Sequence, residues 1–328
     1  MRTLYLSLQG CYLSLDQEQL IIQRQKVEIQ RVQLPLTDQI LVFGNSQITT
    51  PAIRACLQRD IPIAYLSRLG YCYGRTLSIE RGYRQLARYQ QELTAIDRLI
   101  VARKIVQAKI HNCRTLLLRQ QRNNSVLELG KSIEQLQHLS IQVLQVEAIE
   151  RLMGMEGIAA AIYFEAFGRC LQNPDFTFIA RSRRPPGNPV NAMLSFGYQV
   201  IWNHLLTLVE LQGLDPYSGC LHQTSDRHAA LVSDLIEEFR TPIVDSLVLY
   251  LTNRHSIDAA ADFEYRDGGC FLNESGRKKY LAAFLQRMSE PIPTADNQPR
   301  WDLINRQVKK FKQFVYQPTY SYEPYLIR

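Results

Sequence analysis

The chain has 328 residues, 46% of them hydrophobic, which is enough to bury a sizeable core divided between two domains. Its seven cysteines are scattered singly without a CxxC pair, which argues against a disulfide framework or a zinc ribbon, and the sequence has no signal peptide and no run of about 20 apolar residues. We therefore expect a cytoplasmic protein with no membrane contact, and its formal charge of +7 is consistent with a polyanionic partner such as nucleic acid.

Short apolar runs predict strands up to about residue 80. They read TLYLSL, CYLSLD, QLIIQR, KVEIQRV, QILVFG, PIAYLS and YCYGRTLS, and they are broken by glycines and by Pro35. One helix interrupts them and begins at the cap signal Thr50-Pro51. Residues 1–80 are therefore expected to form a small N-terminal β domain.

From about Ile79 the apolar period changes to 3.6, which predicts helices. A long helix is expected from Tyr83 to the pair Asn123-Asn124, and a hairpin at EYRDGGCFLNESG. The other predicted helices cover residues 126–143, 144–172, 191–212, 226–240, 242–254, 276–289 and 301–314. The fold class is therefore α+β: a small N-terminal β domain followed by a larger all-helical C-terminal domain, 81–328, whose Tyr- and Pro-rich end, 316–328, is expected to be a flexible tail.

A glutamate stands out in RLMGMEGIAAAIYFEAF. At about 100° per residue, Glu156 falls on the same side of a helix as Leu152 and Tyr163. A carboxylate in an apolar stripe is costly unless it is paired, protonated or bound to a cation. Two interpretations stay open: pairing with a buried Arg or Lys, or a ligand site, which the surrounding small residues would leave room for.

The stretch LHQTSDRHAALVSDLIEEFR contains further candidate ligands for a site that includes Glu156. His222 follows a turn-rich segment, Asp234 and Glu237 share a helical face, and Glu238 edges towards the apolar side. Each acid alone is most simply a solvated side chain, and a lone histidine is most simply structural. Taken together, Glu156, His222 and one helical acid suit a divalent ion, either Mg²⁺ or Mn²⁺.

Basic residues gather in three places. Seven Lys or Arg and no acid lie between Arg98 and Arg122, and others crowd the last helix. A third group crowds one proline-broken loop: Arg181, Arg183 and Arg184. They are either ordinary solvent-exposed charge or contacts for a phosphate-rich substrate, whose binding would weaken steeply with salt.

With these residues in hand, the sequence resembles the CRISPR-associated protein one family, the universal CRISPR adaptation integrases. The similarity runs in order from about residue 4 to 254. It comprises GCYLSLDQEQLII, ILVFGNSQITTPAIRACLQRDIPIAYLSRLGYCYG, MEGIAAAIYF, NPVNAMLSFGYQVIWNHLLTLVELQGLDPYSGCLH and DLIEEFR.

The resemblance implies a set of site residues. The metal ligands would be Glu156, His222 and Glu237, with Asp234 assisting. Arg240 would contact a DNA phosphate.

The resemblance leaves other residues open. Where relatives often carry an arginine this chain has His228, with Arg227 beside it, and neither is given a role. For Asn191, Ser195 and Tyr198, helix packing and DNA contact remain equally open.

The resemblance also implies an activity. Members dimerise through the β domain, assemble with a small ferredoxin-like CRISPR adaptation partner, and insert spacer DNA into the CRISPR repeat by transesterification, with DNA cleavage as a side reaction. Two alternatives remain: a catalytically silent DNA-bridging scaffold of the same fold, and a metal-dependent hydrolase of small phosphoesters.

Overall fold

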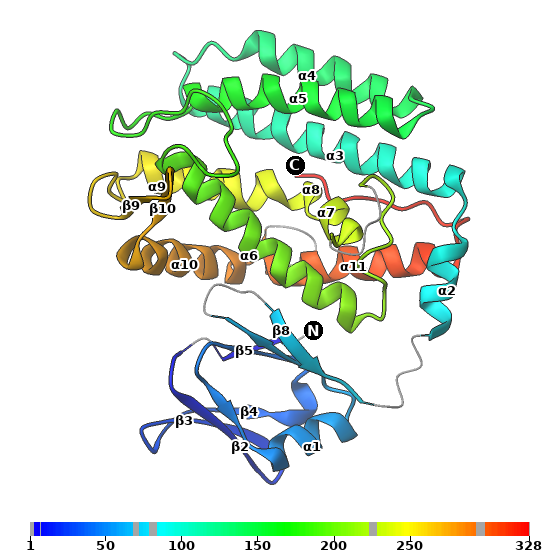
Figure 1. The fold of residues 1–328 in the computed structure, drawn as a ribbon, viewed down its shortest axis with the longest axis vertical. Helices are drawn as coiled ribbons and strands as arrows, with labels where there is room; N and C mark the ends of the chain where they lie inside the picture. Colours follow the sequence, from blue (N-terminus) through cyan, green and yellow to red (C-terminus); the bar gives the residue numbers. More distant parts are fainter. Residues whose placement is uncertain are drawn as a thin grey trace. The chain divides into compact units, whose positions relative to one another are not determined.

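A computed structural model describes residues 3–6, 8–67, 72–78, 84–222, 228–292 and 299–327. The chain divides into two compact units: Met1–Gln90 with Gln199–Asp215, and Gln91–Tyr198 with Pro216–Arg328. A small β region at the N-terminal end precedes a mostly helical remainder (Figure 1). This arrangement confirms the predicted α+β fold class.

Unit one contains two four-stranded sheets. In the first, β1, β5 and β7 run parallel and β8 joins antiparallel; in the second the order is β4-β3-β2-β6. The strands are β1 (Thr3–Leu6), β2 (Cys11–Asp16), β3 (Gln19–Arg24), β4 (Val27–Gln33), β5 (Gln39–Phe43), β6 (Gln47–Ile48), β7 (Ile63–Leu66) and β8 (Cys72–Thr76). Both sheets contribute to one apolar core, in which Leu13, Leu20, Ile40 and Ile63 are fully buried.

Helix α1 (Thr50–Gln58) begins one residue from the predicted cap. The side chain of Thr49 accepts a hydrogen bond from the backbone N–H of Ala52, and Pro51 lies in the first turn, where its missing N–H is not needed. The cap signal therefore located the helix correctly to within a residue.

The rest of the chain is helical apart from one hairpin and irregular segments. The helices are α2 (Arg84–Glu92), α3 (Ala95–Asn123), α4 (Gly130–Gln142), α5 (Ile149–Arg169), α6 (Pro189–Leu211), α7 (Ala230–Leu235), α8 (Glu237–Phe239), α9 (Ser246–Asn253), α10 (Glu274–Ser289) and α11 (Arg300–Tyr316). The hairpin consists of β9 (Phe263–Arg266) and β10 (Gly269–Leu272), which confirms the predicted one.

The single long helix predicted from residue 83 is wrong, because the chain breaks between α2 and α3. Thr94 caps α3: its hydroxyl oxygen accepts the backbone N–H of Asp97 at 3.1 Å, and the Asp97 carboxylate accepts the N–H of Thr94 at 3.0 Å. This reciprocal capping box satisfies two N–H groups that a continuous helix would have bonded internally.

Helices α3, α4 and α5 pack side by side (Figure 1). The buried face of α3 is largely apolar, with Val101, Ile105 and Leu117 fully buried, and α5 buries Leu152 and Phe167. This layer holds the helix that carries Glu156 against α3.

The last segment, residues 317–327, is irregular but packed. Tyr322 and Ile327 are buried, and the ring of Tyr325 stacks on that of Phe239 with centroids 5.7 Å apart. The backbone N–H of Ile327 donates to the side chain of Asn112 on α3. The sequence predicted a flexible tail at 316–328 from its composition. In the structure, Asn112 on α3 and Glu238 on α8, both buried, hydrogen-bond to the backbone of this segment.

The seven cysteines are all free thiols. Six are buried, and only Cys72 on β8 is partly exposed. Across the described residues, no helix combines the length and the apolar character that crossing a membrane requires.

Candidate active site

The segment 230–245 carries much of the predicted site. It comprises α7, α8 and a π-helical turn, Arg240–Asp245, in which Pro242 has no N–H to donate to a regular helix. Its three glutamate and aspartate side chains before that turn are all buried: Asp234, Glu237 and Glu238. The simple interpretation of each acid as a solvated side chain is therefore wrong, because the segment lies inside unit two.

Asp234 fixes the loop that carries His222. Its carboxylate accepts the backbone N–H groups of Cys220, Leu221 (3.0 Å) and His222 (2.9 Å). A Cβ at Gly219 would lie only 2.9 Å from Asp234 Oδ2, so glycine lets the loop approach this closely.

The same carboxylate orients the imidazole. His222 Nδ1 lies 2.7 Å from Asp234 Oδ1. Burial acts to lower the pKa of His222, but the hydrogen bond and the charge of Asp234 outweigh it, and the pKa is raised. With Nδ1–H donating to Asp234, Nε2 is the nitrogen left to face a ligand.

Glu237 and Glu156 are bridged by a lysine. The Lys109 ammonium lies 2.6 Å from Glu237 Oε2 and donates to Glu156 Oε1, and the Arg240 guanidinium lies 2.9 Å from Glu237 Oε1. Burial acts to raise the pKa of Glu237, but Arg240 and Lys109 outweigh it, and the pKa is lowered. Of the two interpretations left open for Glu156, the structure therefore contains the pairing with a buried lysine.

Lys109 was not among the predicted site residues. It lies on the buried stripe of α3 at helical spacing from Ile105, Cys113 and Leu116. A lysine inside one apolar stripe is the natural counterpart of a glutamate inside another, and comparing the two helices could have found it.

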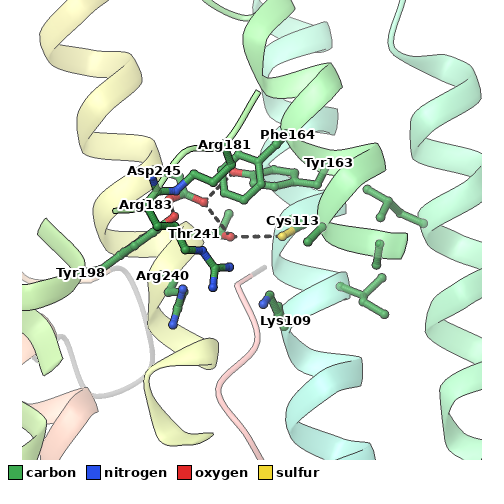
Figure 2. A pocket seen from close by; sticks show the side chains of 14 residues that line it. Lys109, Cys113, Tyr163, Phe164, Arg181, Arg183, Tyr198, Arg240, Thr241 and Asp245 are labelled. Atoms are coloured by element: carbon green, nitrogen blue, oxygen red, sulfur yellow. Dashed lines mark hydrogen bonds between the residues drawn. The ribbon is translucent and has the colours of Figure 1, made fainter. Parts of the chain in front are cut away.

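A second missed residue, the acid Asp245, orders the aromatic side of the site. Its carboxylate accepts hydrogen bonds from the hydroxyl groups of Tyr163 (2.8 Å), Tyr198 (2.5 Å) and Thr241 (3.1 Å) (Figure 2). The guanidinium of Arg240 lies 4.8 Å from the centroid of the Tyr198 ring, within cation–π range. Asp245 thus holds the ring against which Arg240 packs.

The basic loop supplies one anchored and two exposed arginines. Arg181 donates to Asn191 Oδ1 and to Ser195 Oγ, both at 2.9 Å. Asn191 and Ser195 thus orient an arginine, whereas Arg183 and Arg184 are exposed.

A small pocket lies beside these groups (Figure 2). Its lining includes four cationic side chains and three aromatic rings: Lys109, Arg181, Arg183 and Arg240, with Tyr163, Phe164 and Tyr198. It has room for about one water molecule, so a nucleotide would bind at its mouth rather than inside it.

The predicted residues therefore gather in two pairs: His222 is hydrogen-bonded directly to Asp234, and Lys109 bridges Glu156 and Glu237. The exposed ring of His228 lies 6.1 Å from that of His222, whereas Arg227 lies outside the described residues. Among the residues that the structure describes, no three His, Cys, Asp or Glu side chains stand close enough together to hold a metal ion.

A family model described as "CRISPR associated protein Cas1" matches residues 4–286. The chain belongs to the Cas1 family. The resemblance identified from the sequence motifs is therefore confirmed.

Two curated relatives illustrate the similarity to other Cas1 proteins. The "CRISPR-associated endonuclease Cas1 1" of Thermus thermophilus is 32% identical over 312 residues, which cover 94% of this chain and 95% of the relative. The "CRISPR-associated exonuclease Cas4/endonuclease Cas1 fusion" of Geobacter sulfurreducens is 36% identical over 302 residues, and the match spans 88% of this chain but only 53% of the fusion.

Solved structures share the Cas1 fold at lower identity. A Cas1 protein from Thermotoga maritima superposes with a TM-score of 0.71 at 24% identity, covering 97% of each chain. A structure named "Casposase bound to integration product" gives 0.72 at 21% identity over 97% of this chain and 91% of its own. A "Partial Cas6-RT-Cas1--Cas2 complex" gives 0.81 at 24% identity over 99% and 98%.

Proposed function

We propose that this chain is a divalent-metal-dependent DNA endonuclease and integrase of CRISPR adaptation. The observation that carries the proposal is the convergence of two carboxylates from separate helices, Glu156 and Glu237, on one buried cation. Membership of a family whose curated relatives are named endonucleases supports it.

The donor chemistry of the site fits Mg²⁺ or Mn²⁺. Glu237 Oε2 is buried and lies 2.6 Å from the Lys109 ammonium, which also donates to Glu156, so a cation already stands where both acids attract one. Glu156, Glu237 and Nε2 of His222 would hold the ion, a mixed set of oxygen and nitrogen ligands that suits these metals. When bound, the ion would stabilise the charge that develops on the reacting phosphoryl group.

The protein's own residues have separate tasks in this proposal. Asp234 holds His222 in one tautomer, and Arg240 offsets the charge of Glu237. Arg181, Arg183 and Arg184 bind backbone phosphates and align the strands, so that much of the rate enhancement comes from positioning.

The proposed reaction is a transesterification. The 3′ oxygen of a captured fragment bonds to phosphorus at the repeat boundary, while the bond from phosphorus to the leaving 3′ oxygen breaks. The proton of the attacking hydroxyl passes through solvent to the leaving oxygen, so charge and atoms balance.

The proposed setting is cytoplasmic and multimeric. The β domain, residues 1–80, would form a homodimer contact, and residues 81–328 would form the catalytic domain. A small ferredoxin-like adaptation protein would be the further partner, in keeping with structural neighbours whose names include Cas2.

Strand transfer and cleavage of a branched DNA in Mn²⁺ test the site. Glu156→Ala, His222→Ala and Glu237→Ala should each lower the rate by about 100-fold or more, because each removes a ligand. Glu165→Ala is the matched control, since Glu165 is exposed on the same helix as Glu156 and pairs with Arg169, one turn away on that helix. Full activity of all three folded variants would exclude the site.

A second candidate is a catalytically silent DNA-bridging scaffold. The observation favouring it is that both glutamates are already neutralised by Lys109 and Arg240. A scaffold would bind DNA in a salt-sensitive manner with no dependence on Mn²⁺ and no strand transfer, so the same assay separates the two candidates.

A further inference from the structure

Lys109 lies between the two glutamates proposed as metal ligands. Its side chain is 11% exposed, comes from the middle of α3, and reaches carboxylates on α5 and α8. Its ammonium lies 2.6 Å from Glu237 Oε2 and donates to Glu156 Oε1, so it stands as a cation between two acids.

Two cations already accompany the two glutamates. Glu156 and Glu237 each carry a negative charge, and Lys109 and Arg240 each carry a positive one. The Lys109 ammonium contacts Oε1 of Glu156 and Oε2 of Glu237, so a divalent ion that bonded to these oxygens would meet a like charge at the same position. The lysine therefore leaves the carboxylates when the ion binds.

Of the two cations, Lys109 is the one that can move. Arg240 is held by Glu237 on one side and by the Tyr198 ring on the other. The ammonium of Lys109 stands on four flexible methylene groups, and it pairs with the two glutamates that a metal would bind.

We propose that Lys109 is an internal counterion that occupies the cation position between Glu156 and Glu237 in the metal-free protein and is displaced when a divalent ion binds. The inference rests on the proposed function and names what regulates metal entry at that site. It makes metal affinity a competition between an ammonium and a divalent ion for the same oxygen atoms. The displaced ammonium would then be available to a phosphate of the bound DNA.

The test is Mn²⁺ binding in the absence of DNA, measured by the electron paramagnetic resonance signal of free Mn²⁺ and by calorimetry. Lys109→Met removes the competitor and should bind Mn²⁺ about tenfold or more tightly than the wild type, a difference of about 1.4 kcal/mol. Lys109→Arg keeps a cation and should bind as weakly as the wild type. The matched control is Lys104→Met, a lysine of the same helix whose carboxylate partner is Glu323, outside the site.

Thermal unfolding gives a second readout that does not depend on activity. Without metal, Lys109→Met should melt below the wild type because Glu156 and the buried Glu237 lose the cation that bridges them. Saturating Mn²⁺ should raise its Tm by more than it raises the Tm of the wild type. If Lys109→Met does not fold, Lys109→Gln replaces it, compared with Lys109→Arg under the same conditions.

The failures can be told apart. Equal or weaker Mn²⁺ binding by Lys109→Met and Lys109→Gln, while Glu156→Gln abolishes binding, would overturn the counterion role and leave the metal site standing. Unchanged Mn²⁺ binding by Glu156→Gln and His222→Ala as well would overturn the proposed metal site itself.

Discussion

A buried glutamate must find hydrogen-bond donors, and Glu238 finds them in α11 and the C-terminal segment. Its carboxylate accepts the hydroxyl of Tyr322, the amide of Gln307 at 2.9 Å and the backbone N–H of Tyr325 at 2.7 Å. Burial nevertheless raises the pKa of Glu238 to about 7, although these donors act to lower it. Glu238 thus holds the C-terminal segment in place, although it is not one of the proposed metal ligands. Glu238→Ala would remove the three hydrogen bonds of this buried carboxylate.

This shift predicts a pH-dependent stability. Because the folded-state pKa lies above the unfolded value of 4.5, the protonated side chain contributes stability that is complete below pH 4.5 and is lost as the pH rises towards about 7. Glu238→Gln mimics the protonated form, so its free energy of unfolding relative to wild type should increase by on the order of 2 kcal/mol between pH 5 and 8. Urea unfolding at each pH measures this difference in the free energy of unfolding, with Glu165→Gln as the exposed control. Parallel pH profiles for Glu238→Gln and wild type would contradict the prediction.

Single residues also mark the limit of sequence reasoning. Glu156 stood out because it interrupted an apolar stripe, and His222 and Glu237 stood out through their motif. Lys109 lies 47 residues from Glu156 along the chain, and which lysine meets which glutamate depends on how α3 and α5 pack. That pairing was not predictable from either helix alone.

At the scale of elements, Asn112 joins the C-terminal segment to α3. Its side-chain amide donates to the backbone carbonyls of Glu238 (2.9 Å) and Tyr325 (3.0 Å), and its carbonyl accepts the N–H of Ile327 at 2.9 Å. A fully buried amide with three such bonds fixes the tail, α8 and α3 relative to one another.

Asn112→Ala should therefore lower the free energy of unfolding by about 2–3 kcal/mol, because three backbone groups lose their partner. It should also make residues 317–327 more sensitive to limited proteolysis, read out by mass spectrometry. Asn123→Ala, at the exposed last residue of the same helix, is the matched control. Equal proteolysis of Asn112→Ala and wild type would show that the tail does not depend on this junction.

The helices themselves were largely predictable and their interruptions were not. Apolar periodicity locates α6, α10 and α11 to within about two residues, because it reports a continuous buried face. The apolar periodicity does not reveal the break at Thr94, because α2 and α3 are both amphipathic. The spacing of Thr94 and Asp97 is the sequence signal that a new helix begins there. The C-terminal segment 317–327 has no apolar periodicity, because its backbone hydrogen-bonds to side chains of α3 and α8 and not within a helix or strand of its own.

For the whole molecule, the change of period near residue 80 predicted the order of a β region and a helical region. It could not predict that α6 contributes to both compact units, since its first residues belong to unit two and its last to unit one. A helix with one continuous apolar pattern gives no sign of a change of neighbours along its length.

The charge of the whole chain should contribute to the proposed DNA binding. Exposed Arg183 and Arg184 should each neutralise about one phosphate, so the double change to Gln should reduce the slope of log association constant against log salt by about two. Stability should stay within about 0.5 kcal/mol of wild type because both side chains are exposed. Fluorescence anisotropy with duplex DNA at several salt concentrations measures the slope.

The matched control is the double change of Arg277 and Lys278 to Gln on α10, which removes the same charge from another surface. If both double variants reduce the slope equally, the loop has no special role in DNA binding.

The distribution of thiols has a practical consequence for such titrations. Six cysteines are buried and Cys72 alone is partly exposed, on a β8 strand that belongs to unit one. A maleimide fluorophore can therefore be attached to the native protein at one position, outside the candidate active site, with no cysteine added or removed.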